Sequence, residues 1–213
     1  MNDAIFFGAA VTNDSKGWLN LSMTDIYIKL PAWLSDAVKN RSLFADDTAR
    51  MQFAIDLARQ NIDQGTGGPF GAAVFGYKSG ELVSAGVNLV TRLNLSMCHA
   101  EILALSGAQR RLRMFDLSRH DEHLLLYSSA EPCLMCFGAV LWSGIRGLVY
   151  GAKTPDVEAI GFDEGPKPEN WIDILKERGI RVNGGLLRES AVQVLQDYAQ
   201  AGGEIYNPAG KEK

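Results

Sequence analysis

Two short motifs constrain this chain most strongly, because their side chains can work together only if the fold brings them together. The first motif is His99-Ala100-Glu101, and the second is Pro132-Cys133-Leu134-Met135-Cys136. Each motif opens a stretch with the pattern of a helix, so each occupies a predicted helix N-terminus. Thiolates are favoured at helix N-termini, where the aligned peptide dipoles leave a positive partial charge. The motifs therefore predict a fold in which two helix starts converge.

The side chains of these motifs have the chemistry of a catalytic metal site. One histidine and two cysteines supply three zinc ligands and leave a fourth position for water, whereas structural zinc sites usually close with four protein ligands. Glu101 is near enough to His99 to handle the proton of that water without binding the metal. Cys-x-x-Cys alone also occurs in redox sites and zinc ribbons, but the upstream His-Ala-Glu makes the pattern specific. We predict one Zn²⁺ per chain, held by His99, Cys133 and Cys136.

The hydropathy pattern alternates between helices and strands. The predicted helices span 46–65, 99–112, 133–142, 169–178 and 188–200, and the predicted strands span 72–77, 82–90, 123–128, 146–152 and 180–183. Residues 1–45 show no clear period, and 153–168 are expected to form a loop rich in proline and glycine. This order predicts an α/β fold: a three-layer α/β/α sandwich whose mixed sheet combines an antiparallel hairpin with parallel strands.

Charge and composition exclude some classes of partner and indicate a cellular compartment. The net charge of −4 disfavours a long nucleic acid as partner, because non-specific affinity for phosphates depends on lysine and arginine. No apolar run reaches the ~20 residues that span a bilayer, so no membrane partner is expected. The N-terminus lacks the basic start of a secretory signal, and three cysteines is an odd number for a disulfide scaffold. These features predict a cytoplasmic protein.

The length of 213 residues suits one domain with additions. We expect residues 23–213 to form a single catalytic domain with a C-terminal helix and tail. Residues 1–22 are expected to be an extension of it.

The chain resembles the cytidine and deoxycytidylate deaminase superfamily, and within that fold it is most similar to bacterial guanine deaminases. The resemblance covers roughly residues 23–207 and includes the order His-x-Glu…Pro-Cys-x-x-Cys of zinc nucleobase deaminases. It is carried also by the run 67–72, by Asn88, by 131–139 and by Trp142. The most specific part is 160–164 (Ile-Gly-Phe-Asp-Glu), within a run from 157 to 171 that is similar to one guanine deaminase subgroup.

This resemblance implies an activity and assigns roles by position. The activity is the zinc-dependent hydrolytic deamination of guanine to xanthine and ammonia, as in purine salvage. Glu101 would transfer a proton from water to the purine ring, and Glu164 would help to move a proton to the departing amino group. The implied substrate-binding residues are Asn88, Phe70, Trp142 and Ala100. A homodimer is also implied, with Tyr206 serving either as a lid residue or as a packing anchor for the tail.

Several alternatives stay open from the sequence. The substrate is alternatively guanosine, ammeline or cytosine, and a zinc-bound scaffold without turnover is a further interpretation. The intact Glu101 argues against a scaffold, since a structural zinc has no need of a carboxylate that does not bind it. Glu158 and Asp163 compete with Glu164, because an acidic side chain in a Gly/Pro loop is usually solvated.

Overall fold

A mixed sheet of five strands forms the centre of the computed structural model, which describes residues 26–39 and 43–207. The strands are β1 (Gly71–Gly76), β2 (Leu82–Val87), β3 (Leu124–Ala130), β4 (Gly147–Ala152) and β5 (Arg181–Gly184). They lie in the order β2-β1-β3-β4-β5. Strand β1 pairs antiparallel with both β2 and β3, whereas β3, β4 and β5 run parallel. The predicted combination of a hairpin with parallel strands is confirmed.

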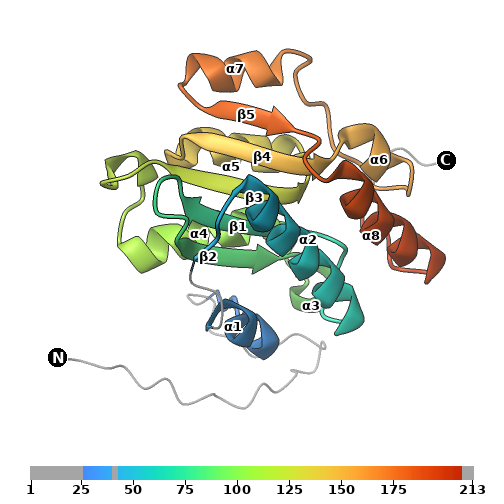
Figure 1. Ribbon diagram of the computed structural model, residues 1–213. Helices are drawn as coiled ribbons and strands as arrows, with labels where there is room; N and C mark the ends of the chain where they lie inside the picture. Colours follow the sequence, from blue (N-terminus) through green and yellow to red (C-terminus); the bar gives the residue numbers. More distant parts are fainter. Residues whose placement is uncertain (1–25, 40–42, 208–213) are drawn as a thin grey trace.

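Helices cover both faces of this sheet (Figure 1). They are α1 (Ala32–Lys39), α2 (Asp47–Asp63), α3 (Val90–Leu93), α4 (Ala100–Leu112), α5 (Leu134–Ser143), α6 (Thr154–Glu158), α7 (Trp171–Glu177) and α8 (Arg188–Gln200), with a 3₁₀ turn at Leu117–Arg119. Helices α2 and α8 pack on one face, and α4, α5 and α7 pack on the other. None of the helices in the described ranges is both long and apolar enough to cross a membrane.

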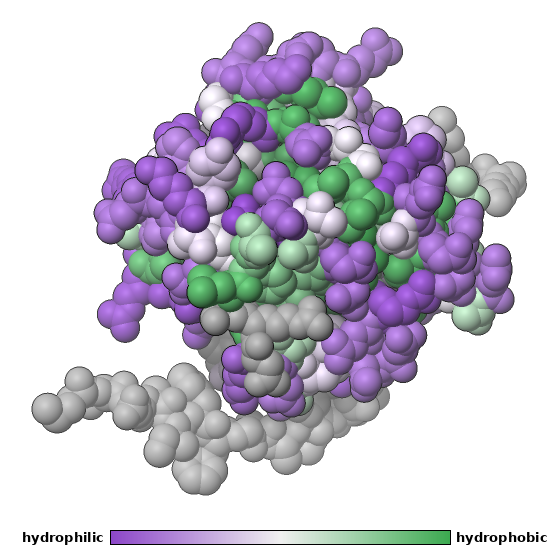
Figure 2. Space-filling model, viewed as in Figure 1, coloured by the Kyte–Doolittle hydropathy of each residue, from purple (hydrophilic) through white to green (hydrophobic). Residues whose placement is uncertain are grey.

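Two hydrophobic cores, one on each face of the sheet, hold the three layers together. Successive side chains of a strand point to opposite faces. Accordingly, Ala73 and Phe75 of β1 pack toward α2 and α8, while Ala72 and Val74 pack toward α4 and α5. All four are fully buried. The face seen in Figure 2 carries mostly hydrophilic residues around its rim, with hydrophobic residues toward its middle. The predicted α/β/α sandwich is confirmed.

Local signals explain where several helices begin and end. The carboxylate of Asp46 accepts a hydrogen bond from the backbone N–H of Ala49 at 2.8 Å, which caps the start of α2 as expected. Helix α5 ends at Gly144, whose φ of 81° lies in the left-handed region that glycine adopts without strain. The main helices and strands therefore lie within a few residues of their predicted positions.

Three short helices were not expected from the sequence. Helices α1 and α3 are too short to show a clear period. Helix α6 corrects the prediction of a loop over 153–168. Its Pro155 has a fixed φ that suits a first helical turn, and the carboxylate of Asp156 accepts a hydrogen bond from the N–H of Lys153 at 2.8 Å. The predicted extension 1–22 lies outside the described residues.

Candidate active site

The two sequence motifs meet as expected at the N-termini of α4 and α5. His99 is the N-cap residue of α4, Cys133 is the N-cap residue of α5, and Cys136 lies in the first turn of α5. The Nδ1 atom of His99 is 3.6 Å from the Sγ atom of each cysteine. In a tetrahedral zinc site, nitrogen and sulfur ligands lie roughly 3.5 Å apart, given the usual metal–ligand distances. The spacing and donor set of this cluster therefore fit one zinc ion.

The two thiols differ strongly in acidity. A hydrogen bond from Cys136, together with one from His99, outweighs the opposing effect of burial and lowers the pKa of Cys133 to about 4. The same bond between the thiols, together with burial, raises the pKa of Cys136 well above its ordinary value. The pair thus shares one proton in the metal-free chain. Binding of a metal ion deprotonates a coordinating thiol outright, so zinc would displace that remaining proton.

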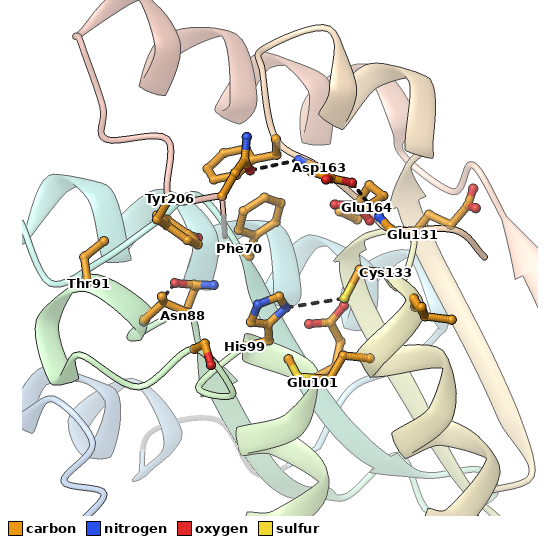
Figure 3. Close-up of a pocket in the computed structure, with 18 of the residues that line it drawn as sticks. Phe70, Asn88, Thr91, His99, Glu101, Glu131, Cys133, Asp163, Glu164 and Tyr206 are labelled. Carbon is orange, nitrogen blue, oxygen red and sulfur yellow. Dashed lines mark hydrogen bonds between the residues drawn. The ribbon is translucent and has the colours of Figure 1, made fainter. Parts of the chain in front are cut away.

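Glu101 lies beside the cluster without being part of it. The residue is 6% exposed, and its carboxylate points toward Cys133 from the first turn of α4 (Figure 3). Burial, and then the negative charge of Cys133, raise the pKa of this carboxyl. A carboxyl with a raised pKa near a metal site is suited to accepting and returning a proton.

Glu164 approaches the same cluster from the loop that follows α6. Its side chain is 8% exposed, whereas Glu158 and Asp163, its competitors in the sequence, are exposed. The backbone carbonyl of Glu164 accepts a hydrogen bond from the N–H of Leu134 at 3.0 Å, so this loop is docked on the first turn of α5. Burial, followed by the charges of Cys133 and Glu101, raises the pKa of Glu164 to about 8. Two carboxyl groups with raised pKa values therefore flank the cluster.

A pocket of about 760 Å³ opens over the cluster and the two carboxyl groups. The Oδ1 atom of Asn88 accepts a hydrogen bond from the N–H of Val90 at 3.2 Å, which fixes the side-chain amide and directs its NH₂ group into the pocket (Figure 3). The ring of Phe70 forms part of the wall, with its centre 5.2 Å from that of Phe162 in an edge-to-face contact. An aromatic wall and a fixed amide suit a flat, polar-edged ligand.

The C-terminal tail closes the pocket on the side of Phe162. The ring centres of Phe162 and Tyr206 lie 4.9 Å apart. Asn207 donates to the carbonyl of Gly161 at 2.8 Å and accepts from the N–H of Asp163 at 3.0 Å. The hydroxyl of Tyr206 is buried and has no hydrogen-bond partner among residues 26–39 and 43–207. This hydroxyl also lies so close to Gly68 that a β-carbon at that position would collide with it.

Two of the residues expected in the pocket lie elsewhere. Trp142 is 84% exposed and does not line the pocket, which corrects its assignment as a wall. The physical reason is that α5 meets the pocket with its first turn, and Trp142 is in its last turn, roughly 12 Å further along the helix axis. Ala100 is fully buried in the core between α4 and the sheet and does not line the pocket either.

Two further polar residues were missed by the sequence analysis. Glu131 and Lys167 form a buried ion pair with a distance of 2.6 Å between Oε1 and Nζ. Glu131 lies two residues before Cys133 and lines the pocket. Glu131 directly precedes the second motif, and that proximity was its only signal. Lys167 lies between two prolines, and nothing in its local pattern marks it as buried.

The chain is similar to known deaminases in sequence and in structure. The family model of the cytidine and deoxycytidylate deaminase zinc-binding region matches residues 45–152. The guanine deaminase of Bacillus subtilis is 37% identical over 111 residues, which cover 52% of this chain and 67% of that protein. The structure of guanine deaminase from Nitrosomonas europaea is similar with a TM-score of 0.81 and 48% identity, over 85% of this chain and 100% of that chain. A structure of NE0047 in complex with 2,6-diaminopurine has a TM-score of 0.80 and 51% identity, over 85% of this chain and 96% of that one.

Proposed function

The chain belongs to the cytidine and deoxycytidylate deaminase family as a zinc-dependent aminohydrolase, and we propose that it converts guanine and water to xanthine and ammonia. One observation carries this proposal. Two buried carboxyl groups, those of Glu101 and Glu164, flank the His-Cys-Cys cluster at the inner end of a pocket with an aromatic wall. The similarity to guanine deaminases and to a protein that binds 2,6-diaminopurine supports a purine with a 2-amino group as substrate.

The first carboxyl group acts on the attacking water. Zinc held by His99, Cys133 and Cys136 would supply water activated for attack near neutral pH. Glu101 accepts a proton from this water and passes it to ring nitrogen N3, beside the carbon that is attacked. Its burial favours this exchange, because a carboxyl with a raised pKa returns a proton more readily than an exposed one.

The second carboxyl group acts on the departing nitrogen. The bond between C2 and the exocyclic nitrogen breaks only after that nitrogen has gained a proton, so that ammonia leaves. Burial raises the pKa of Glu164, which favours the protonated form that this step needs. The proton that the new hydroxyl on C2 loses as the carbonyl forms then restores Glu164. Two carboxyl groups divide the work, one serving the ring nitrogen and the other the amine.

The remaining pocket residues bind and orient the base. The NH₂ group of Asn88 donates to an acceptor on the purine edge, and the ring of Phe70 covers one face of the base. Burial under Phe162 and Tyr206 excludes bulk water and strengthens each of these polar contacts.

An ammonia-release assay tests the proposal. Zinc-loaded protein is given guanine, guanosine, ammeline, cytosine and adenine side by side, and we expect guanine to be turned over well above the rest. Glu101→Gln should abolish turnover while zinc, measured by mass spectrometry, stays at one per chain. Preference for another base contradicts guanine as substrate. Zinc-loaded protein that releases ammonia from none of the five bases would favour the scaffold interpretation.

We also propose that the protein is a homodimer assembled through α5. Leu134, Met135 and Trp142 all expose apolar side chains on this helix, and Trp142 exposes most. Large exposed apolar groups on one helix commonly mark an interface. Light scattering during size-exclusion chromatography should give twice the chain mass for the wild type and a lower mass for Trp142→Glu.

A cytoplasmic location and a single catalytic domain complete the proposal. The three cysteines form no disulfide, and a reducing compartment keeps thiols available for zinc. A variant lacking residues 1–22 should retain kcat/KM within about threefold, because the family match begins only at residue 45. A tenfold loss would contradict the assignment of the catalytic domain to 23–213.

A further inference from the structure

Helix α6 and the residues that follow it form one compact loop, residues 154–167, whose two ends meet at one buried carboxylate. At the first end, the hydroxyl of Thr154 donates to Oε1 of Glu131 at 2.8 Å. At the other end, Nζ of Lys167 donates to the same oxygen at 2.6 Å and to the Thr154 hydroxyl at 3.2 Å. Compact loops with adjoining ends are often functional. We call the contact among Glu131, Thr154 and Lys167 the neck of this loop.

The charged side chains of the neck are shielded from solvent, and their polar groups are paired by hydrogen bonds. The side chains of Lys167 and Glu131 are only 8% and 9% exposed. Besides Glu131 and Thr154, Lys167 donates to the carbonyl of Pro132 at 2.8 Å, so each of its three ammonium protons has an acceptor. Its Nζ atom also lies 4.5 Å from the centre of the Trp171 ring. A lysine is rarely buried to this extent unless it is paired, and this one is paired on every side.

The neck joins the two halves of the catalytic machinery. On one side, Glu131 and Pro132 lead directly to the zinc ligand Cys133. On the other side, the chain that ends at Lys167 carries Glu164 three residues earlier. The carbonyl of Glu164 accepts from the N–H of Leu134 at 3.0 Å, which ties the same loop to the turn that holds Cys133. The distance between Glu164 and the zinc ligands therefore depends on the neck.

We propose that Lys167 is a positioning residue, which holds the loop 154–167 against the turn of Cys133 and thereby places Glu164 for proton transfer to the leaving group. The catalytic part of this inference rests on the proposed function, whereas the mechanical part, that Lys167 orders the loop, does not. Lys167 does not itself line the pocket, so it acts through the residues that it holds, which are Glu131 and the loop that carries Glu164. Proton transfer tolerates little displacement, and a shift of about 1 Å can lower a rate about 100-fold.

The chain offers a matched control in the next helix. Lys176 of α7 pairs with Asp173 at 3.3 Å, but these side chains are 60% and 68% exposed. Exposed ion pairs of this kind contribute little to the stability of the folded protein. Both variants, Lys176→Met and Lys167→Met, replace a paired lysine by methionine. Only Lys167→Met changes the neck.

The test compares these variants in the full-length zinc enzyme. For Lys167→Met we expect kcat on guanine to fall at least about tenfold while KM changes less than about threefold, because the group that is displaced acts after the base is bound. Zinc should stay at one per chain. Hydrogen exchange of the backbone amides in 154–167, followed by mass spectrometry, should become faster. Lys176→Met should match the wild type in all four measurements.

A milder variant covers the case in which Lys167→Met does not fold. Thr154→Val removes two hydrogen bonds of the neck, the one donated to Glu131 and the one accepted from Lys167, but keeps the ion pair between Glu131 and Lys167. It should give the same pattern at a smaller size, with kcat lowered about threefold. Unchanged hydrogen exchange of 154–167 in whichever variant folds would overturn the mechanical part. Faster exchange with unchanged kcat, or a loss of activity that follows the loss of zinc, would overturn the positioning role. If the wild type turns over another base of the panel, kcat is measured on that base, and if it turns over none, the exchange and zinc measurements decide.

Discussion

The floor and the roof of the pocket are built by different means. The floor consists of His99, Glu101, Cys133 and Cys136, which all lie at the N-termini of α4 and α5. The roof consists of the loop 154–167 and the tail 203–207, which carry Glu164 and Tyr206 and are held by side-chain hydrogen bonds and ring contacts. Regular helices therefore fix the metal ligands, while a few polar contacts fix the groups that close over the base. Rigid elements suit the atoms that must not move, and loops suit those that meet the ligand.

The largest loss of zinc and of activity is expected for a variant of the floor. Cys136→Ser removes a zinc ligand, so we expect zinc below 0.1 per chain and kcat/KM reduced by at least about 1000-fold, since a ligated metal is lost with its ligand. Zinc is measured by mass spectrometry and turnover by ammonia release. Cys98→Ala is the matched control, because Cys98 is buried beside His99 but is not part of the cluster. Equal loss of zinc from both variants would contradict the assignment of ligands.

A smaller effect is expected in the roof. Glu164→Gln keeps the shape of the side chain but cannot deliver a proton, so kcat should fall about 100-fold with zinc retained. The control is Glu158→Gln in the same segment, whose side chain is exposed and does not line the pocket. Unlike Cys136→Ser, Glu164→Gln should retain its zinc. Loss of zinc from Glu164→Gln would show that zinc binding by the floor depends on the roof.

Glu164 also makes stability depend on pH. Its pKa of about 8 in the folded, metal-free chain exceeds the ordinary value of 4.5, so the folded state keeps a proton that the unfolded state releases. This contribution is fully present below pH 4.5 and is lost as pH rises toward 8, at up to about 1.4 kcal/mol per pH unit. As pH rises from 5 to 8, the Tm of the metal-free wild type should therefore fall relative to the Tm of metal-free Glu164→Gln. A constant difference in Tm would contradict the raised pKa.

The smallest expected effect concerns the tail. Asn207→Ala removes both hydrogen bonds that join the tail to Gly161 and Asp163. These bonds are exposed, so we expect KM for guanine to rise about threefold to tenfold with kcat little changed, in line with about 1 kcal/mol for such contacts. Asn183→Ala on the exposed strand β5 is the control and should change neither. An equal response of kcat would place Asn207 in the chemical step instead of binding.

The sequence predicted the floor better than the roof for a physical reason. The starts of α4 and α5 are local features, visible in the motifs around His99 and Cys133 and confirmed by the helix bounds. The ion pair between Glu131 and Lys167 joins residues 36 apart, and no local pattern indicates it. Trp142 was assigned to the pocket from the resemblance alone, although the predicted helix start at Cys133 already places the last turn of α5 roughly 12 Å from the site.

The contact between Gly68 and Tyr206 limits how this protein can change over evolutionary time. A β-carbon at position 68 would collide with the tyrosine hydroxyl, so a residue larger than glycine there requires the side chain of Tyr206 to shift or to be smaller. The residue that suits position 68 therefore depends on the residue at 206, although 138 positions separate them. The contact thus links the sequence of the loop before β1 to the sequence of the tail after α8.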